Sequence, residues 1–359
     1  MQSNHATLTV PMITDLSIII VSWNVWDLLR AALTSIEQAS RASSLGNDVR
    51  YFGPASLGDR APTLEVVVVD NASADATAEL LPARFPWVRF IRSATNLGFP
   101  AGNNVGYATS RGRTIYFLNP DTELVNAPLA ATGAQDGPGD SLWTLYRALM
   151  DNPTIGMVGP QLRYGDNSLQ DSRRRFPTFM YAVCETDMLG RYWRNNPWRR
   201  AYHMKEWPAT IPQDADWLSG AAMLARRDAL EQIRQPEFSG PFDEGFFMYS
   251  EEVDLCKRLK DAGWRIVYIP QATVIHYEGQ SSGQVVTARY IYHYRSQIRY
   301  HKKHFGQGQA TLLHLIILVN LSWQLLIEAC KWLVGHKRGL RAARVQSYRQ
   351  ILAADLRAA

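Results

Sequence analysis

Apolar residues in the first third of this chain fall into four short runs, which are separated by polar or amphipathic stretches. The runs cover residues 16–22, 64–69, 88–91 and 114–118. Runs that are apolar nearly throughout, rather than alternating, are typical of parallel strands buried on both faces. Helical patterns lie between the runs, so strand and helix alternate along the chain. This order predicts an α/β fold with a doubly wound, mostly parallel sheet.

The rest of the chain shows weaker patterns. The predicted helices are 27–39, 141–151, 251–262 and 288–305, and the further predicted strands are 155–159, 217–224 and 264–269. Residues 160–215 are predicted to be irregular, aromatic and basic. The loop-like segments 40–62 and 127–140 are interpreted as insertions, and residues 1–15 as a polar tail.

The C-terminal part, residues 307–359, has a character of its own. Residues 312–334 are strongly apolar, yet Asn320, Gln324, Glu328 and Lys331 recur at spacings of four, four and three. This spacing places the polar groups on one stripe of a helix. A membrane-spanning helix needs ~20 residues with few polar groups. We therefore expect a helix in the membrane interface, followed by basic helices that suit an anionic leaflet. A spanning helix and an oligomer contact are the alternatives.

Composition narrows the class of protein. At 359 residues and 46% apolar content, the chain can form one large α/β domain with appendages. Its three cysteines are far apart and match no metal-binding spacing, which favours a reducing compartment. The first residues lack an apolar signal core, so we expect a cytoplasmic protein at the inner face of the membrane. The net charge of +5 is modest and no nucleic-acid-binding motif occurs, which disfavours a nucleic-acid partner.

Two of the apolar runs end in a carboxylate. Asp70 follows 66–69, and Asp121 follows 115–118 after Asn119 and a proline. Ligands of open α/β sheets bind just past the carboxyl ends of the strands. The two acids therefore predict one pocket for a nucleotide and a divalent metal, because carboxylate oxygens suit Mg²⁺ or Mn²⁺. The alternative is that both are turn formers.

Seven short motifs in this order resemble glycosyltransferase family 2, the GT-A fold of inverting enzymes that use nucleotide sugars. The motifs are SIIIVSWN at 17–24, VVVVDNASAD at 66–75, NLGFPAGNN at 96–104, FLNPDTEL at 117–124, WLSGAAMLARR at 217–227, FFMYSEEVDLCKRL at 246–259 and His276. Within the family, the chain looks most like the rhamnosyltransferase-type members that act on bacterial cell-surface glycans. The resemblance implies a GT-A domain over 16–306, with a Rossmann-like nucleotide half and an acceptor half.

The resemblance assigns one group of residues to the nucleotide-sugar donor. These are Ser22, Trp23, Asn24, Asp70, Asn71, Asn96, Gly98, Asn103 and Asn119. Asp70 would accept a hydrogen bond from the imide N–H of uracil or thymine, which selects those bases. The turn at 96–104 would close over the nucleotide, although a plain turn and helix cap is the alternative.

A second group would bind the metal. Asp121 resembles the last carboxylate of the family's DxD motif, whose first position is here Asn119. His276 resembles a further metal ligand of such enzymes, and a structural histidine is the alternative. The ion, Mg²⁺ or Mn²⁺, would bridge the two phosphates and stabilise the departing nucleoside diphosphate.

A third group would serve the acceptor. The family usually shows Glu-Asp where this chain has Glu251-Glu252, and the second residue is the general base, so Glu252 takes that role by resemblance. Asp254 stays a competitor, and all three acids could simply complement the helix dipole. Arg173, Arg174 and Arg175 could hold a phosphate or form a solvated loop, while Trp217 and Gly220 resemble the acceptor-side wall or pack in the core.

Together these residues imply an inverting glycosyltransferase. The expected reaction moves L-rhamnose from dTDP-rhamnose to a lipid-linked or growing surface glycan, and homo-oligomers are possible partners. The alternatives are a UDP-sugar transferase, for example of a furanose, and an inactive nucleotide-sugar-binding membrane scaffold. A processive synthase is disfavoured because the chain lacks a Gln-x-x-Arg-Trp motif and several spanning helices. A nucleotidylyltransferase is disfavoured because no glycine-rich loop follows the first strand.

Overall fold

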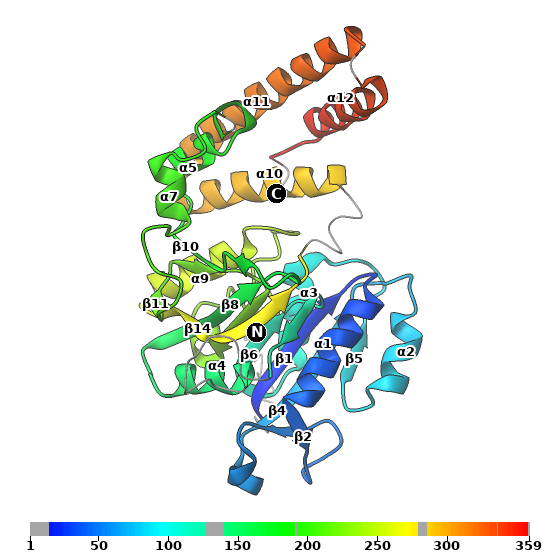
Figure 1. Cartoon of the computed structure of the whole chain (residues 1–359), viewed down its shortest axis with the longest axis vertical. Helices are drawn as coiled ribbons and strands as arrows, with labels where there is room; N and C mark the ends of the chain where they lie inside the picture. Colours follow the sequence, from blue (N-terminus) through cyan, green and yellow to red (C-terminus); the bar gives the residue numbers. More distant parts are fainter. Residues whose placement is uncertain (1–13, 127–139, 191, 279–285, 336, 358–359) are drawn as a thin grey trace, which may run out of the picture.

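A large mixed sheet with helices packed on both faces forms the body of the protein (Figure 1). The computed structural model describes residues 14–126, 140–190, 192–278, 286–335 and 337–357. The strands are β1 Thr14–Ser22, β2 Ser40–Ala42, β3 Arg50–Phe52, β4 Thr63–Asp70, β5 Arg89–Arg92, β6 Gly112–Leu118, β7 Thr122–Leu124, β8 Ile155–Arg163, β9 Leu169–Gln170, β10 Arg173–Arg174, β11 Gln213–Asp214, β12 Trp217–Leu218, β13 Ala222–Arg226 and β14 Arg265–His276. The helices are α1 Trp26–Gln38, the 3₁₀ helix η1 Ala55–Arg60, α2 Thr77–Arg84, α3 Gly98–Thr109, α4 Ser141–Met150, α5 Phe179–Cys184, α6 Asp187–Gly190, α7 Pro197–Tyr202, α8 Arg227–Gln232, α9 Glu251–Asp261, α10 Val286–Phe305, α11 Gln307–Leu333 and α12 Arg338–Ala353.

The strand order confirms the predicted α/β class with its doubly wound, mostly parallel sheet. The main sheet runs β11-β14-β8-β13-β6-β1-β4-β3-β2, and β5 pairs with β4. The ladders β6-β1-β4-β5 of the nucleotide half are all parallel. In the other half, β13 lies antiparallel between β6 and β8, while β14 is parallel to β8.

Alternate residues of each strand fill two separate cores, as expected for a sheet covered on both faces. Ile18 and Val68 pack with α1, α2 and α4 on one face. Ile19 and Phe117 pack with α3, α8 and α9 on the other. These two cores hold the carboxyl ends of β1, β4 and β6 at one edge of the sheet.

The structure corrects some predicted boundaries. The segment 40–62 is no plain surface insertion, because β2 and β3 extend the sheet as an antiparallel edge. The predicted strand 217–224 is two strands, β12 and β13, and β1 starts inside the predicted tail. The stretch 160–215 contains short helices and two-residue strands where irregular chain was predicted. The second predicted insertion lies almost wholly outside the described residues.

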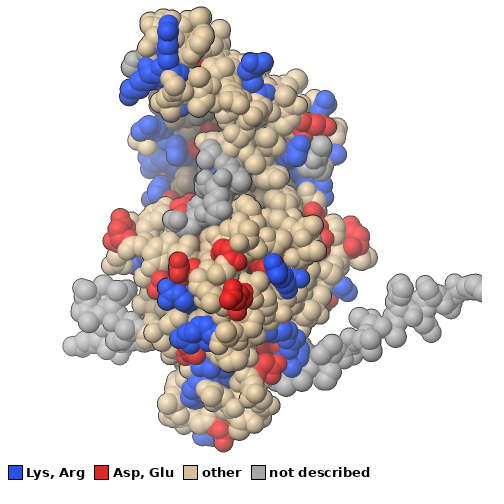
Figure 2. All heavy atoms as spheres, turned by 90° about the vertical axis from the view of Figure 1, so that its right-hand side faces the viewer, with Lys and Arg blue, Asp and Glu red and all other residues tan. Residues whose placement is uncertain are grey.

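The last three helices form a layer above the sheet body (Figure 1). Helix α11 packs on α10, α12 and α5 through Leu313, Ile317 and Leu321. Within the described part of the chain, α11 is the one helix long and apolar enough to cross a membrane, with a mean hydropathy of 1.9. Most of the charged side chains that Figure 2 shows on the upper part of the molecule are Lys and Arg.

Candidate active site

Asp70 occupies the position expected of a ligand-binding carboxylate at the end of β4. It lies directly beside Ser22, its register partner at the end of β1. Asp70 is fully buried, and its Oδ1 accepts a hydrogen bond from the backbone N of Ser73 (3.2 Å). Its Oδ2 has no hydrogen-bond partner within the described residues and lies 3.7 Å from Nε of Arg92. A buried acceptor oxygen without a donor is costly, so this atom is poised for a ligand donor.

The turns after β1 and β4 are tied to each other. Asn24 adopts a left-handed conformation (φ 54°), and its Oδ1 accepts from the backbone N of Ala74 (2.7 Å). Its own backbone N donates to Ser73 Oγ (2.9 Å). Trp23 is half-buried beside it, and the hydroxyl of Ser22 is buried without a partner among the described residues. The predicted base-binding residues are therefore brought together at one rim.

The glycine-asparagine turn docks on this rim and on a distant loop. Asn71 Nδ2 donates to the carbonyl of Gly98 (2.9 Å), and Asn96 Oδ1 accepts from the backbone N of Gly98 (2.9 Å). Gly98 has φ +82°, and a Cβ there would lie 2.5 Å from the carbonyl oxygen of Phe247. Glycine is thus required both by conformation and by close approach.

Two neighbouring asparagines in α3 make different hydrogen bonds. Asn103 Nδ2 donates to the carbonyl of Phe99 one turn earlier (2.9 Å). Asn104 was not singled out from the sequence, yet its side chain donates to the carbonyl of Phe242 (2.9 Å) and to Glu244 Oε1 (2.8 Å). Asn104 therefore links the nucleotide half to the loop before α9, a contact between residues 138 positions apart.

The two residues predicted to bind the metal lie together. His276 Nε2 is 3.4 Å from Asp121 Oδ1, and both side chains are nearly buried. The other ring nitrogen of His276 lies 3.0 Å from Gln170 Oε1, and Gln170 Nε2 donates to Glu278 (2.9 Å). Asn119 Oδ1 is buried without a hydrogen-bond partner among the described residues.

These residues fit a metal that brings most of its own ligands. Nowhere in the described ranges do three or more His, Cys, Asp or Glu side chains gather as a metal cage. A nucleotide-bound Mg²⁺ or Mn²⁺ needs fewer protein ligands, because phosphates and waters complete its octahedron. Asp121 and His276 can supply two such contacts, and the unpartnered Asn119 oxygen offers a third.

The backbone is strained just before α9, whose first two residues are Glu251 and Glu252. Tyr249 and Ser250 both have positive φ (71° and 63°), an uncommon conformation for such residues and one found at functional sites. Glu251 is buried, Glu252 is partly exposed, and Oε2 of each is buried without a partner in the described structure. Burial raises the pKa of both carboxyl groups, and for Glu251 the neighbouring Glu252 raises it further. Arg174 opposes the rise in the pKa of Glu252.

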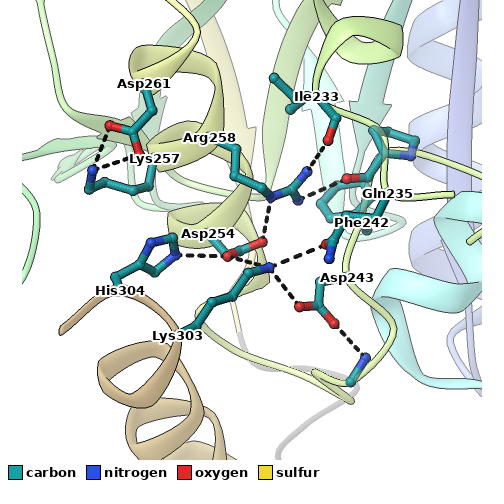
Figure 3. A network of polar contacts seen from close by, with 12 residues as sticks. Ile233, Gln235, Phe242, Asp243, Asp254, Lys257, Arg258, Asp261, Lys303 and His304 are labelled. Atoms are coloured by element: carbon teal, nitrogen blue, oxygen red, sulfur yellow. Dashed lines mark hydrogen bonds and ion pairs between the residues drawn. The ribbon is translucent and has the colours of Figure 1, made fainter. Parts of the chain in front are cut away.

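Asp254 has a different environment, although it lies only two residues further along (Figure 3). Its Oδ2 accepts from Arg258 Nε (2.8 Å), and its Oδ1 lies 2.9 Å from Lys303 Nζ and 2.8 Å from His304 Nε2. It has no exposed surface. Although burial opposes the shift, the hydrogen bond with His304 and the charges of Arg258 and Lys303 hold the pKa of Asp254 well below its usual range. A carboxylate engaged in this way anchors α9 to α10, which argues against Asp254 as the base.

The arginine segment lies beside Glu252, but its members separate. Arg173 is buried, donates to the carbonyl of Trp207 (2.8 Å) and stacks on Tyr268, which argues against a phosphate contact. Arg174 lies over the Trp217 ring (5.3 Å), so the indole is covered rather than open to a sugar. Its neighbour Arg175 pairs with Asp216 (3.3 Å) instead.

Gly220 fits the predicted wall more closely. A Cβ at Gly220 would lie 3.6 Å from Cβ of Glu252, so the backbone of this segment runs directly beside the glutamate. A larger residue at position 220 would fill space next to the carboxyl group. Gly220 therefore helps to keep the surroundings of Glu252 open.

Helix α10 packs against residues 247–249 of the loop before α9, a contact that the sequence did not reveal. The ring of Tyr292 stacks on Phe247 (4.4 Å), and Ser296 Oγ donates to the carbonyl of Met248 (2.8 Å). The ring of His293 packs edge-on against Tyr249 (5.8 Å). The tyrosine-rich composition of 288–305 was the available signal, but a helix pattern does not say which loop a helix contacts.

Comparisons with known proteins match the chain to two family models and to named relatives. The model described as glycosyl transferase family 2 matches residues 17–127, and one described as glycosyltransferase like family 2 matches 200–290. The chain is 35% identical over 276 residues to the N-acetylglucosaminyl-diphospho-decaprenol L-rhamnosyltransferase of Mycobacterium tuberculosis, which covers 73% of this chain and 82% of the relative. It is also 35% identical over 85 residues to rhamnosyltransferase WbbL of Escherichia coli, covering 24% of this chain and 30% of that protein.

Among solved structures, the mannosyltransferase PcManGT from Pyrobaculum calidifontis in complex with GDP-Man and Mn²⁺ aligns with a TM-score of 0.48 and 15% identity. The alignment covers 95% of this chain and 88% of that one.

Proposed function

This chain belongs to glycosyltransferase family 2 and resembles its rhamnosyltransferases, and from that premise we propose that it transfers L-rhamnose from dTDP-rhamnose to a sugar carried by a polyprenyl diphosphate. The observation that carries the proposal is the 35% identity, over most of both chains, to a relative whose name states this type of donor sugar and acceptor. Asp70 Oδ2 accepts no hydrogen bond from the described residues, which supports a thymine or uracil base, whose N3–H can donate to it.

The metal role is proposed for Asp121 and His276, with Asn119 beside them. A bound Mg²⁺ or Mn²⁺ would stabilise the negative charge of the nucleoside diphosphate as it leaves. In this chain Asp121 supplies the charged contact and His276 is held in orientation by Gln170. Replacing Asp121 with Ala should abolish metal-dependent donor binding, which calorimetry with Mn²⁺ and with EDTA would measure.

Glu252 is the proposed general base. In an inverting displacement, the acceptor oxygen bonds to the anomeric carbon on the face opposite the nucleotide, while its proton passes to the base. Glu252 has a buried oxygen without a partner, and Arg174 favours its charged form. Glu251 is more deeply buried and has a strongly raised pKa. It would stay protonated while Glu252 is ionised, because two adjacent carboxyl groups do not both lose their protons readily.

Membrane attachment through α11 is proposed as well. The outer stripe of α11 is apolar and exposed, and consists of Leu312, Leu315, Val319, Trp323, Leu326 and Leu333. Asn320, Gln324 and Glu328 of the same helix are buried against its neighbours, and basic residues of α12 follow it. An anionic bilayer fits both features, since its acyl region would cover the apolar stripe and its headgroups would attract the arginines.

The first experiment is calorimetric titration of the full chain with dTDP-rhamnose, dTDP, UDP, UDP-galactose and GDP, followed by a transfer assay with N-acetylglucosaminyl-diphospho-polyprenol. Metal-dependent binding of dTDP species and formation of a rhamnosylated lipid are expected. Preferential binding of UDP would move the donor to another sugar. Nucleotide binding without transfer or hydrolysis would point to an inactive scaffold, and would overturn the proposed reaction.

A further inference from the structure

A cavity of about 610 Å³ lies within the C-terminal helical layer, apart from the donor and metal residues. Helices α10, α11 and α12 form most of its wall, and the end of α5 closes it. Its aromatic and aliphatic lining includes Tyr290, Tyr294, Leu321 and Ile351. This volume falls in the range of small-molecule sites.

The lining also contains polar and charged groups. Arg344 on α12 faces the cavity, half-exposed, with a long 3.6 Å contact to Glu328. Glu185 is the other charged lining residue, and it lies 3.5 Å from Arg199. His293 on α10 also lines the cavity. A mixed wall of tyrosines, aliphatic side chains and polar groups, with one guanidinium group, suits an amphiphile that has an anionic end.

The cavity adjoins the surroundings of Glu252 on two sides. On one side, the His293 ring contacts Tyr249, which precedes the glutamate pair by two residues. On the other side, Tyr181 of α5 is the chain neighbour of the lining residue Ala182; its ring stacks on Tyr202 at 3.7 Å, and Tyr202 lies 6.0 Å from the Trp217 ring. The cavity wall is therefore continuous with the residues around the proposed base.

The outer wall of the cavity is the membrane-facing helix. Ile317 and Leu321 of α11 line the cavity, while Leu315 and Val319 of the same helix point outward with exposed fractions of 52% and 62%. A lipid that lies in the bilayer beside α11 is thus separated from the proposed base only by the helical layer that contains the cavity. In Figure 1, α10 lies between the sheet body and the pair α11 and α12.

We propose that this cavity binds the lipid-diphosphate part of the acceptor, with the isoprenoid units nearest the phosphates against the tyrosines and the anionic end near Arg344. This assignment rests on the proposed function, because it presumes a lipid-linked acceptor. It adds that the protein itself, and not only the bilayer, distinguishes acceptors by the length of their isoprenoid chain. Substitutions that fill the cavity should then weaken long-chain acceptors selectively.

The test compares the same substitution at two adjacent positions of α12. Both alanines are exposed, but Ala343 lines the cavity and Ala342 does not. Ala343→Trp should raise KM for a farnesyl-diphosphate-linked N-acetylglucosamine about tenfold or more, and leave KM for a methyl-diphosphate analogue unchanged. Ala342→Trp should leave both values unchanged. Equal KM values in Ala343→Trp and wild type for the farnesyl acceptor would overturn the proposal.

A second readout needs no turnover, so it separates this inference from the proposed reaction. A benzophenone-bearing farnesyl diphosphate should photo-crosslink to peptides of α10 or α12 in the wild-type full chain, and Ala343→Trp should reduce that labelling. Labelling confined to other helices would overturn the cavity assignment. If the wild type labels there but transfers no rhamnose, the cavity assignment stands and the proposed reaction fails. Where Ala343→Trp does not fold, judged by circular dichroism, Ser347→Phe fills the same cavity from the next turn.

Discussion

The strands of the sheet body bury mainly apolar side chains, whereas α11 of the C-terminal helical layer buries a row of polar side chains beside its apolar ones. In the sheet body, Ile18, Val68 and Phe117 are fully buried. In α11, Asn320, Gln324 and Glu328 are buried at 3–5% exposure, while the outer stripe of the same helix is apolar. Soluble proteins rarely expose large contiguous apolar patches, so such a stripe indicates a covering surface. This difference supports the proposal that α11 lies against a bilayer while the sheet body faces water.

The inward polar stripe of α11 contains a residue that forms ion pairs with α12. Glu328 accepts from Arg341 Nη1 (2.6 Å) and lies near Lys331 and Arg344. Although burial opposes the shift, these cations lower the pKa of Glu328. The stripe thus joins α11 to α12 by an ion pair, while the apolar side remains open to a bilayer. Changes in the two regions should therefore have separable effects.

The largest effect is expected from Glu252→Gln in the sheet body. Loss of the general base should lower kcat by about 10²–10⁴-fold while dTDP-rhamnose binding and membrane association stay unchanged. The matched control is Glu251→Gln, which copies a neutral carboxyl group and should keep most activity. Single-turnover transfer assays and calorimetry would measure both variants. Normal transfer by Glu252→Gln, with loss in Glu251→Gln, would move the role to Glu251.

The next effect concerns stability at the junction of the two regions. Asp254→Asn should lower the free energy of unfolding by about 3–5 kcal/mol, because Arg258 and Lys303 would lose their buried partner. Asp261→Asn, at an exposed site on the same helix, should cost about 1 kcal/mol or less. Urea unfolding would compare the two.

The pH dependence of that stability has a defined sign. Since the folded-state pKa of Asp254 is lowered, its contribution is present above the unfolded pKa and is lost as the pH falls through the folded one. The difference between wild type and Asp254→Asn should therefore shrink as the pH falls below about 4. A difference that grows with acidity would contradict the ion-pair role.

A smaller effect is expected when a charge is placed on the membrane face. Leu315→Asp should weaken binding to anionic vesicles by about tenfold, because a carboxylate would enter the apolar stripe. The matched control is Leu80→Asp on α2, an exposed leucine of the sheet body, which should bind vesicles like wild type. Vesicle co-sedimentation of the full chain measures both. Equal loss in the two variants would remove the distinction between the regions.

The smallest effect is a shift of the activity profile. Arg174→Met should raise the pKa of Glu252, since Arg174 now lowers it, and should move the acid limb of the pH–kcat/KM profile to higher pH. Arg175→Met is the control, because Arg175 pairs with Asp216. An unshifted limb in Arg174→Met would show that another group sets it.

The sequence by itself determined the strands of the nucleotide half and the place of the polar residues at their ends. A run such as 66–69 is long and apolar enough to be a buried strand in any context, and Asp70 must then emerge at its carboxyl end. The same local reasoning placed the polar stripe of α11 on one side of a helix. These features depend on neighbours within one or two turns.

Only the tertiary structure decided which carboxyl group is available as a base, that of Glu252, and which is held in ion pairs, that of Asp254. Glu252 and Asp254 are two positions apart, so they lie about 200° apart around α9. Their difference comes from Lys303 and His304, some fifty residues away, which reach Asp254. Likewise, only packing showed that the polar stripe of α11 faces inward, because helical spacing defines a stripe but not the side on which other helices lie.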